Sequence, residues 1–96
     1  MKIYISGKIT GNPDYKAQFA AAAEHIRALG DIPLNPAELP QGMTPSDYMR
    51  ICFAMVDSAD EVMMIYPEWQ DSPGARIEKA YAEYIGKKIS HFMTKE

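Results

Sequence analysis

A carboxylate near the start of an expected helix is the feature of this sequence most able to carry chemistry. Glu78 lies in the stretch SPGARIEKAYAEYIG, where Ser72, Pro73 and Gly74 have the composition of a helix start. The free backbone N–H groups and the dipole of such a helix favour an anion, either a bound phosphate or the charged form of Glu78. This pattern alone fits both an ordinary solvated glutamate and the centre of an active site.

A second loop with chemical potential follows the first expected strand. Its residues are Gly7, Lys8, Ile9, Thr10 and Gly11. The two glycines permit tight curvature and expose backbone N–H groups that can approach a ligand. A plain strand-to-helix turn accounts for the same residues, because neither the Walker loop nor the dinucleotide-binding GxGxxG pattern is present.

Trp69 lies in the polar loop before the helix that carries Glu78. It is either an anchor that packs this loop down or a surface on which a base or a sugar stacks. A metal site is not expected, because His25 and His91 lack partners at ligand spacing and Cys52 is the only cysteine. No cofactor is expected either.

The elements that must position these residues can be predicted from the spacing of apolar side chains. Short β-branched or apolar segments alternate with segments of helical periodicity. We expect strands at 2–6, 31–34, 61–66 and 88–92, and helices at 14–29, 45–59 and 73–86. Thr44 is the expected cap of the second helix, and Ser72 or its neighbour is the expected cap of the third.

This alternation predicts one domain over residues 1–96, an α/β three-layer sandwich of the flavodoxin-like or Rossmann-like type. Right-handed crossovers favour a four-stranded parallel sheet of order 2-1-3-4. In such sheets ligands bind beyond the carboxyl ends of the strands, at the switch point between strands 1 and 3. The loops expected there are GKITGNP and PEWQDSPG, so the topology directs both to one crevice.

Composition limits the class of protein. The chain has 96 residues, 47% of them hydrophobic, and a net charge of −3. No run of lysine and arginine marks a track for a nucleic-acid duplex, although a few N–H groups can still bind a small anion. The single cysteine, the absence of a signal-peptide pattern and the absence of a long apolar run predict a cytoplasmic protein with no membrane partner.

Three motifs carry a resemblance to a known family. They are YISGKITG (Tyr4 to Gly11), SADEVMMI (Ser58 to Ile65), and S-x-G-x-x-x-E followed by A-x-x-x-G (Ser72, Gly74, Glu78, Ala82 and Gly86). Over nearly its whole length the sequence resembles the nucleoside 2-deoxyribosyltransferase superfamily. It is most similar there to the 2′-deoxynucleoside 5′-monophosphate N-glycosidase branch and to short phage and prophage relatives.

The resemblance implies chemistry at an N-glycosidic bond. The family's helix glutamate, here Glu78, attacks C1′ of the sugar to form a covalent glycosyl-enzyme, which water or a second base then resolves. Tyr4 would orient that carboxylate, and no metal or cofactor is implied. A small-molecule nucleotide or nucleoside is the expected partner, and the family's assemblies predict a homo-oligomer. The expected substrate-binding residues are Gly7, Lys8, Ile9, Gly11, Trp69, Ser72 and Gly74.

One departure from the family pattern keeps the alternatives open. Many members carry an aspartate in helix 2 where this chain has Cys52, so the acid that protonates the leaving base is missing, weakened or supplied elsewhere. The first hypothesis is an enzyme that cleaves or transfers the base through Glu78. The second is a catalytically weakened protein that binds a nucleotide or a nucleotide-derived signal. The third is an α/β subunit that acts by contact with a partner.

Overall fold

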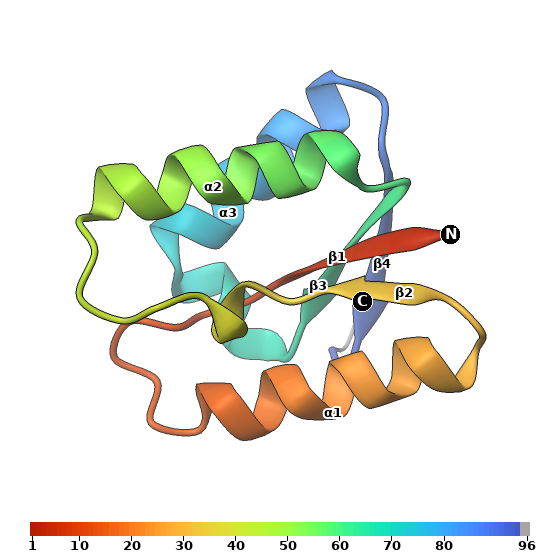
Figure 1. The fold of residues 1–96 in the computed structure, drawn as a ribbon, viewed down its shortest axis with the longest axis horizontal. Coiled ribbons are helices and arrows are strands. Elements are labelled where there is room, and N and C mark those ends of the chain that lie inside the picture. Colours follow the sequence, from red (N-terminus) through yellow and green to blue (C-terminus); the bar gives the residue numbers. More distant parts are fainter. Residues whose placement is uncertain (95–96) are drawn as a thin grey trace.

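Within residues 1–94, which the computed structural model describes, four parallel strands form one sheet flanked by helices (Figure 1). The strands are β1 (Lys2–Ser6), β2 (Ile32–Leu34), β3 (Glu61–Ile65) and β4 (Lys88–Phe92). The α-helices are α1 (Tyr15–Ala28), α2 (Pro45–Ser58) and α3 (Pro73–Tyr84). The strand order is β2-β1-β3-β4, which confirms the predicted α/β fold and its parallel 2-1-3-4 sheet.

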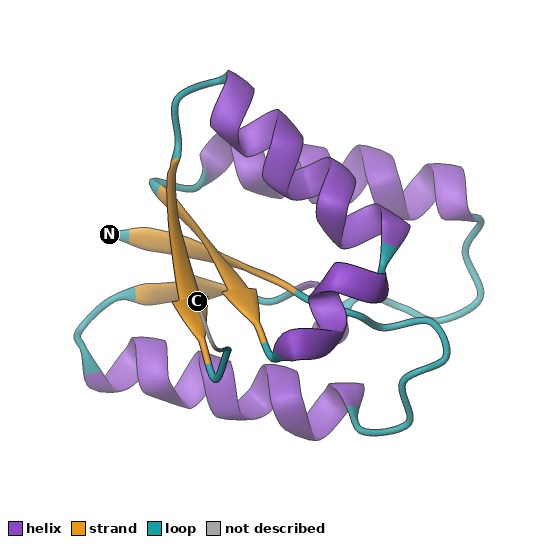
Figure 2. Ribbon diagram, turned by 180° about the vertical axis from the view of Figure 1, so that it is seen from behind, coloured by secondary structure: helices purple, strands orange, loops and turns teal. Residues whose placement is uncertain are grey.

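Two separate cores hold the layers together. Helix α1 covers one face of the sheet, and α2 and α3 cover the other (Figures 1 and 2). The core on the α1 side contains Ile3, Ile5, Phe19, Ala22, Ala23, Ile26, Met63 and Ile65. The core on the other side contains Tyr4, Cys52, Val56, Ala59, Val62, Met64, Trp69, Ala75 and Ala82. Successive residues of β1 and β3 thus alternate between the two cores, as the pleat of a strand requires.

Helices α2 and α3 begin at the predicted caps. Thr44 Oγ1 accepts a hydrogen bond from Asp47 N at 3.1 Å, and Asp47 Oδ2 accepts one from Thr44 N at 3.2 Å, which completes a capping box. Ser72 Oγ accepts from Ala75 N at 3.2 Å and starts α3. Helix α1 differs, because Asp14 precedes it without making a side-chain capping bond.

Two segments predicted to be loops contain short 3-10 helices, η1 (Pro36–Glu38) and η2 (Pro67–Asp71). A proline at the start of each fixes φ near the helical value. Strand β3 ends at Ile65 and not at Tyr66, because Tyr66 has a φ of 59°, outside the extended region. The predicted bounds of β1 and β4 agree with the observed ones, and the other predicted boundaries differ by at most two residues.

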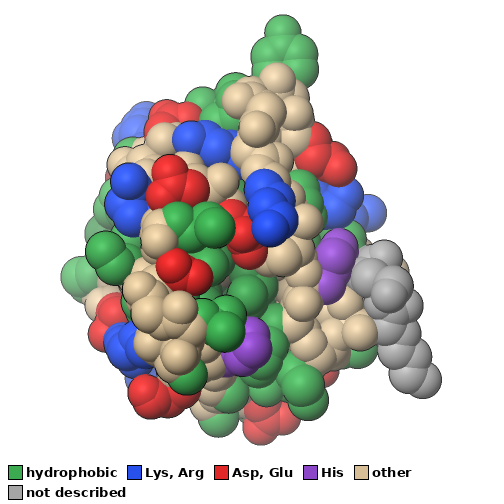
Figure 3. All heavy atoms as spheres, turned by 90° about the vertical axis from the view of Figure 1, so that its right-hand side faces the viewer, with side chains coloured by type: hydrophobic (Ala, Val, Ile, Leu, Met, Phe, Trp, Pro, Cys, Tyr) green, Lys and Arg blue, Asp and Glu red, His purple; other side chains and the backbone are tan. Residues whose placement is uncertain are grey.

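On the face shown in Figure 3, acidic and basic side chains are interspersed, so this face carries no continuous cationic track. None of the helices in the described part of the chain combines the length and the hydropathy that crossing a membrane requires.

Gly7 directly follows β1, and its backbone lies close to the side chains of Ile65 and Phe19. A Cβ atom there would lie 2.7 Å from Cγ1 of Ile65 and 3.2 Å from Cζ of Phe19. The substitution Gly7→Ala should therefore lower the free energy of unfolding by about 1–3 kcal/mol, the usual cost of overpacking. Urea denaturation of the two proteins measures this difference.

Gly74→Ala is the matched control for this prediction. A Cβ atom at Gly74 would meet Ser72 Oγ at 4.0 Å, an ordinary contact, and alanine has the higher helix propensity. The free energy of unfolding of this variant should stay unchanged or rise by up to about 1 kcal/mol. Equal losses in the two variants would contradict the steric role assigned to Gly7.

Candidate active site

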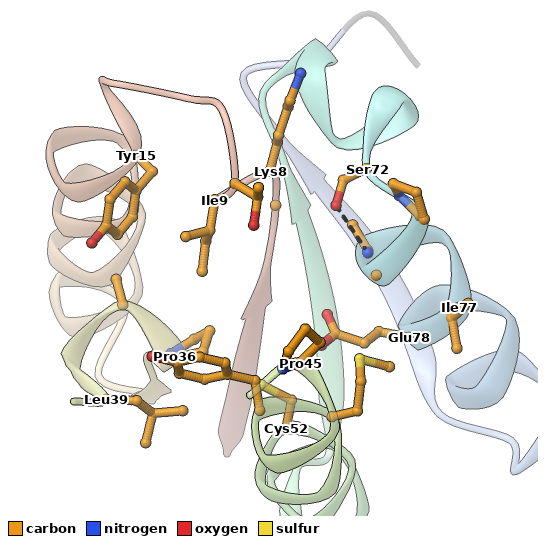
Figure 4. A pocket seen from close by; sticks show the side chains of 18 of the residues that line it. Lys8, Ile9, Tyr15, Pro36, Leu39, Pro45, Cys52, Ser72, Ile77 and Glu78 are labelled. Atoms are coloured by element: carbon orange, nitrogen blue, oxygen red, sulfur yellow. Dashed lines mark hydrogen bonds between the residues drawn. The ribbon is translucent and has the colours of Figure 1, made fainter. Parts of the chain in front are cut away.

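A cavity of about 660 Å³ opens beyond the carboxyl end of β1, beside the first turns of α2 and α3 (Figure 4). Its volume falls in the range of small-molecule sites. This is the sheet edge at which the topology predicts the two loops to meet. The predicted site residues on its wall are Tyr4, Gly7, Lys8, Ile9, Ser72, Gly74 and Glu78.

The side chain of Glu78 is held between two hydroxyl groups from β1. Only 7% of Glu78 is exposed. The Tyr4 hydroxyl donates to its Oε2 at 2.9 Å, and the Ser6 hydroxyl donates to its Oε1 at 2.8 Å. Tyr4 and Ser6 are two residues apart on one strand, so both point towards α3. The sequence prediction missed Ser6, although its alternation with Tyr4 was a usable signal.

Burial shifts the pKa values of the ionisable side chains in this cluster. It raises the pKa of the Glu78 carboxyl above its ordinary value, while the hydrogen bonds from Ser6 and Tyr4 oppose that rise. Burial, together with the nearby charge of Glu78, also raises the pKa of the Tyr4 phenol well above its usual value. Tyr4 therefore keeps its proton near neutral pH and acts as a hydrogen-bond donor.

Cys52 belongs to the same cluster. It is a buried residue of α2 that lies on the cavity wall (Figure 4). Its thiol interacts with Tyr4 and Glu78. Burial raises the pKa of this thiol to about 11, so the group is neutral near neutral pH. Asp57, one and a half turns further along α2, instead accepts a hydrogen bond from the exposed Tyr81 hydroxyl at 2.6 Å and does not line the cavity.

The N-terminus of α3 forms a polar end of the cavity. The Ser72 hydroxyl oxygen accepts the capping bond from Ala75 N, which leaves its own proton free to donate. Lys8 is the only cation among the described residues of the wall. Its side chain extends away from Glu78 (Figure 4). The wall also includes Asp71, an exposed residue directly before Ser72.

An apolar and aromatic wall faces this polar end. Two hydrogen bonds fix its rings, since Gln41 Nε2 donates to the Tyr15 hydroxyl at 3.2 Å and the Tyr48 hydroxyl donates to the Pro40 carbonyl at 2.5 Å. The other apolar lining residues include Ile9, Pro36, Leu39, Met43, Met49 and Ile77. Sequence reasoning identified only Ile9 of this wall. The prolines of the segment 35–45 predicted a loop, but they did not indicate which of its side chains line the cavity.

Two of the predicted binding residues lie off the cavity wall. Trp69 is 8% exposed and packs in the core beneath α2 and α3, with its ring 5.9 Å from Lys79 Nζ and 6.2 Å from the His91 ring. This position fits the anchor interpretation of Trp69 and not the stacking one. Gly11 has a φ of 75° and shapes the turn that follows β1.

The residues that the structure describes contain no group of three or more histidine, cysteine, aspartate or glutamate side chains able to hold a metal ion.

The family described as "Domain of unknown function (DUF4406)" matches residues 1–91. The matched region includes both loops of the cavity, Cys52 and Glu78. No curated protein matches the chain.

Burial of Glu78 predicts a pH-dependent cost to stability. Because its pKa is higher in the folded protein than in the unfolded chain, the folded state loses stability as the pH rises from about the ordinary value of 4.5 through the raised value. Glu78→Gln removes this titration. The variant should therefore gain stability relative to the parent over that pH interval, and the gain should then level off.

Urea denaturation at a series of pH values measures this difference. Glu83→Gln, on the exposed part of the same helix and paired with Lys79 at 3.0 Å, controls for the loss of a carboxylate from α3. A stability difference between Glu78→Gln and the parent that stays constant with pH would contradict the assigned effect of burial.

Proposed function

We propose that this chain, which belongs to the DUF4406 family, cleaves or transfers the N-glycosidic bond of a nucleoside or deoxynucleoside 5′-monophosphate. Glu78 is the nucleophile of this proposal. The observation that carries it is the buried Glu78 carboxylate on the cavity wall, oriented at both oxygens by hydroxyl donors. The resemblance of the flanking motifs to the nucleoside 2-deoxyribosyltransferase superfamily supplies the reaction class.

The geometry around Glu78 suits attack on an electron-poor carbon. Departure of the base leaves positive charge on C1′ and the ring oxygen, and a carboxylate at that position stabilises it. The two carboxylate oxygens have four lone pairs, and the donors Tyr4, Ser6 and Cys52 occupy at most three of them. A lone pair therefore remains for bonding to C1′ while the donors keep the group from rotating.

The polar end of the cavity suits a phosphate. The first turn of α3 presents backbone N–H groups and the positive end of the helix dipole, and Ser72 and Lys8 add donors. With a rise of about 1.5 Å per residue, the cap at Ser72 lies roughly 9 Å from Glu78 along the helix axis. This spacing is of the order of a phosphorylated pentose, so a 5′-phosphate at Ser72 can place C1′ near Glu78.

The apolar wall suits the heterocycle. Tyr15 and Tyr48 provide rings, and the aliphatic side chains around them remove a planar base from water. The partner is therefore a small molecule with a phosphate at one end and a flat ring at the other. The homo-oligomer and the cytoplasmic location stay predictions from the sequence.

A second candidate function is nucleotide binding without turnover. The observation in its favour is Cys52, a neutral thiol beside Glu78 where many members of the resembled superfamily carry an acid. Such a protein would keep the phosphate and ring contacts of the cavity and lack the proton transfer that helps an ordinary base to leave.

Base release by the purified protein tests the proposal. The protein is incubated with nucleoside and deoxynucleoside 5′-monophosphates, and free base is followed by chromatography. Glu78→Gln should lower the rate by about 10³-fold or more, because it removes the group that forms the covalent intermediate. Glu83→Gln should retain the parent rate. Binding of nucleotides without release of base from any of them would favour the second candidate.

The two donors to Glu78 predict a shift in the pH profile. Tyr4→Phe and Ser6→Ala each remove a hydrogen bond that favours the ionised carboxylate, so each should raise the pKa of Glu78 further and move the rise of kcat to higher pH. Misplacement of the nucleophile should also lower the plateau value of kcat by about 10–100-fold. A lowered plateau with an unmoved pH profile would contradict the role assigned to these hydroxyls.

A further inference from the structure

We propose that the preferred substrates of this cavity are nucleotides whose leaving group is already cationic, a pyridinium-type heterocycle joined to C1′ through its quaternary nitrogen. This inference rests on the proposed function, because it takes Glu78 as the nucleophile. It names the class of N-glycoside that the remaining groups of the cavity can cleave.

The carboxyl groups of the cavity do not provide an acid at the ring end. An ordinary purine or pyrimidine leaves as an anion unless an acid protonates it, so its cleavage needs a proton donor beside the heterocycle. Among the described residues of the wall, the carboxyl groups are those of Glu78 and Asp71. Glu78 is the nucleophile, and Asp71 directly precedes the cap of α3, at the phosphate end.

The other proton-bearing groups near Glu78 already donate a hydrogen bond to it, are weak acids, or extend away from it. The Tyr4 and Ser6 hydroxyls both donate to the Glu78 carboxylate. The Cys52 thiol has a pKa raised to about 11, so it gives up its proton poorly near neutral pH. The Lys8 side chain extends away from Glu78 (Figure 4).

The buried negative charge in the cavity also favours a cationic substrate. Glu78 is a buried carboxylate whose partners are all neutral, namely the hydroxyls of Tyr4 and Ser6 and the thiol of Cys52. A cationic substrate supplies the opposite charge that such a group lacks and favours its ionised form. The rings of Tyr15 and Tyr48 on the wall are also suited to a flat cation, which is attracted to aromatic faces.

The reaction balances without an acid. The C1′–N bond breaks and its electron pair goes to the ring nitrogen, so the pyridinium leaves as a neutral pyridine. A Glu78 oxygen forms the bond to C1′. Water then adds to C1′, the bond from Glu78 breaks, and one proton passes to the solvent in each turnover. Hydrolysis of an ordinary base releases no net proton, because the departing base takes it up.

Nicotinamide mononucleotide is the test substrate, and its reduced dihydropyridine form is the matched control of the same shape with a neutral ring. Adenosine and uridine monophosphates and their deoxy forms complete the set. We expect kcat/KM for the cationic nucleotide to exceed that for every neutral one by at least about 100-fold, the scale on which proton donation contributes. In weak buffer, one proton should appear for each pyridine released.

Three variants complete the test. Glu78→Gln should abolish cleavage of the cationic nucleotide, and Glu83→Gln, whose side chain lies off the cavity wall, should retain the parent rate. Asp71→Asn, shown to be folded by circular dichroism, removes the other carboxyl group of the wall and should lower kcat far less than Glu78→Gln does. Faster cleavage of an ordinary nucleotide, or a loss in Asp71→Asn as large as that in Glu78→Gln, would overturn the inference and leave the proposed function standing. Cleavage of none of the nucleotides would overturn both.

Discussion

The burial of one carboxylate is the constraint on which the rest of the site depends. A charged group removed from water needs donors that replace its hydration. Glu78 obtains them from Tyr4 and Ser6, at 2.9 and 2.8 Å. A strand that runs against the first turns of α3 supplies two such side chains on one face, because its residues alternate with a period of two. The central position of β1 in the sheet order β2-β1-β3-β4 provides that strand.

Small residues keep the two elements close enough for these bonds to form. On α3, Ala75 and Ala82 share the buried face with Glu78 and pack in the core over the sheet. Beyond β1, Gly7 leaves only the space of a hydrogen atom beside Ile65. Larger side chains at these positions would move α3 or the loop outwards and separate the carboxylate from its donors. Residues that stabilise the fold therefore also fix the geometry of the site.

The sequence predicted the sheet order because hydrophobic periodicity and the handedness of crossovers are local rules. Tyr4 could also be predicted as a site residue from the sequence, since it begins the motif YISGKITG. Ser6 lies in the same motif but was missed, because only its alternation with Tyr4 along the strand indicates that its side chain faces Glu78. The contributions of Tyr15 and Tyr48 depend on the path of the segment 35–44, which no local pattern fixes. Trp69 remained ambiguous until η2 placed it in the core.

The thiol at Cys52 changes the electrostatics of the cluster as well as its supply of protons. A second carboxyl group beside Glu78 would place two like charges together, and the pair would hold one proton between them. A thiol that keeps its proton, with a pKa near 11, leaves Glu78 as the only anion of the buried cluster. Glu78 then ionises at lower cost, but the cluster has no second carboxyl group that could act as an acid. In the function that we propose, this one residue shifts the demand for positive charge from the protein to its substrate.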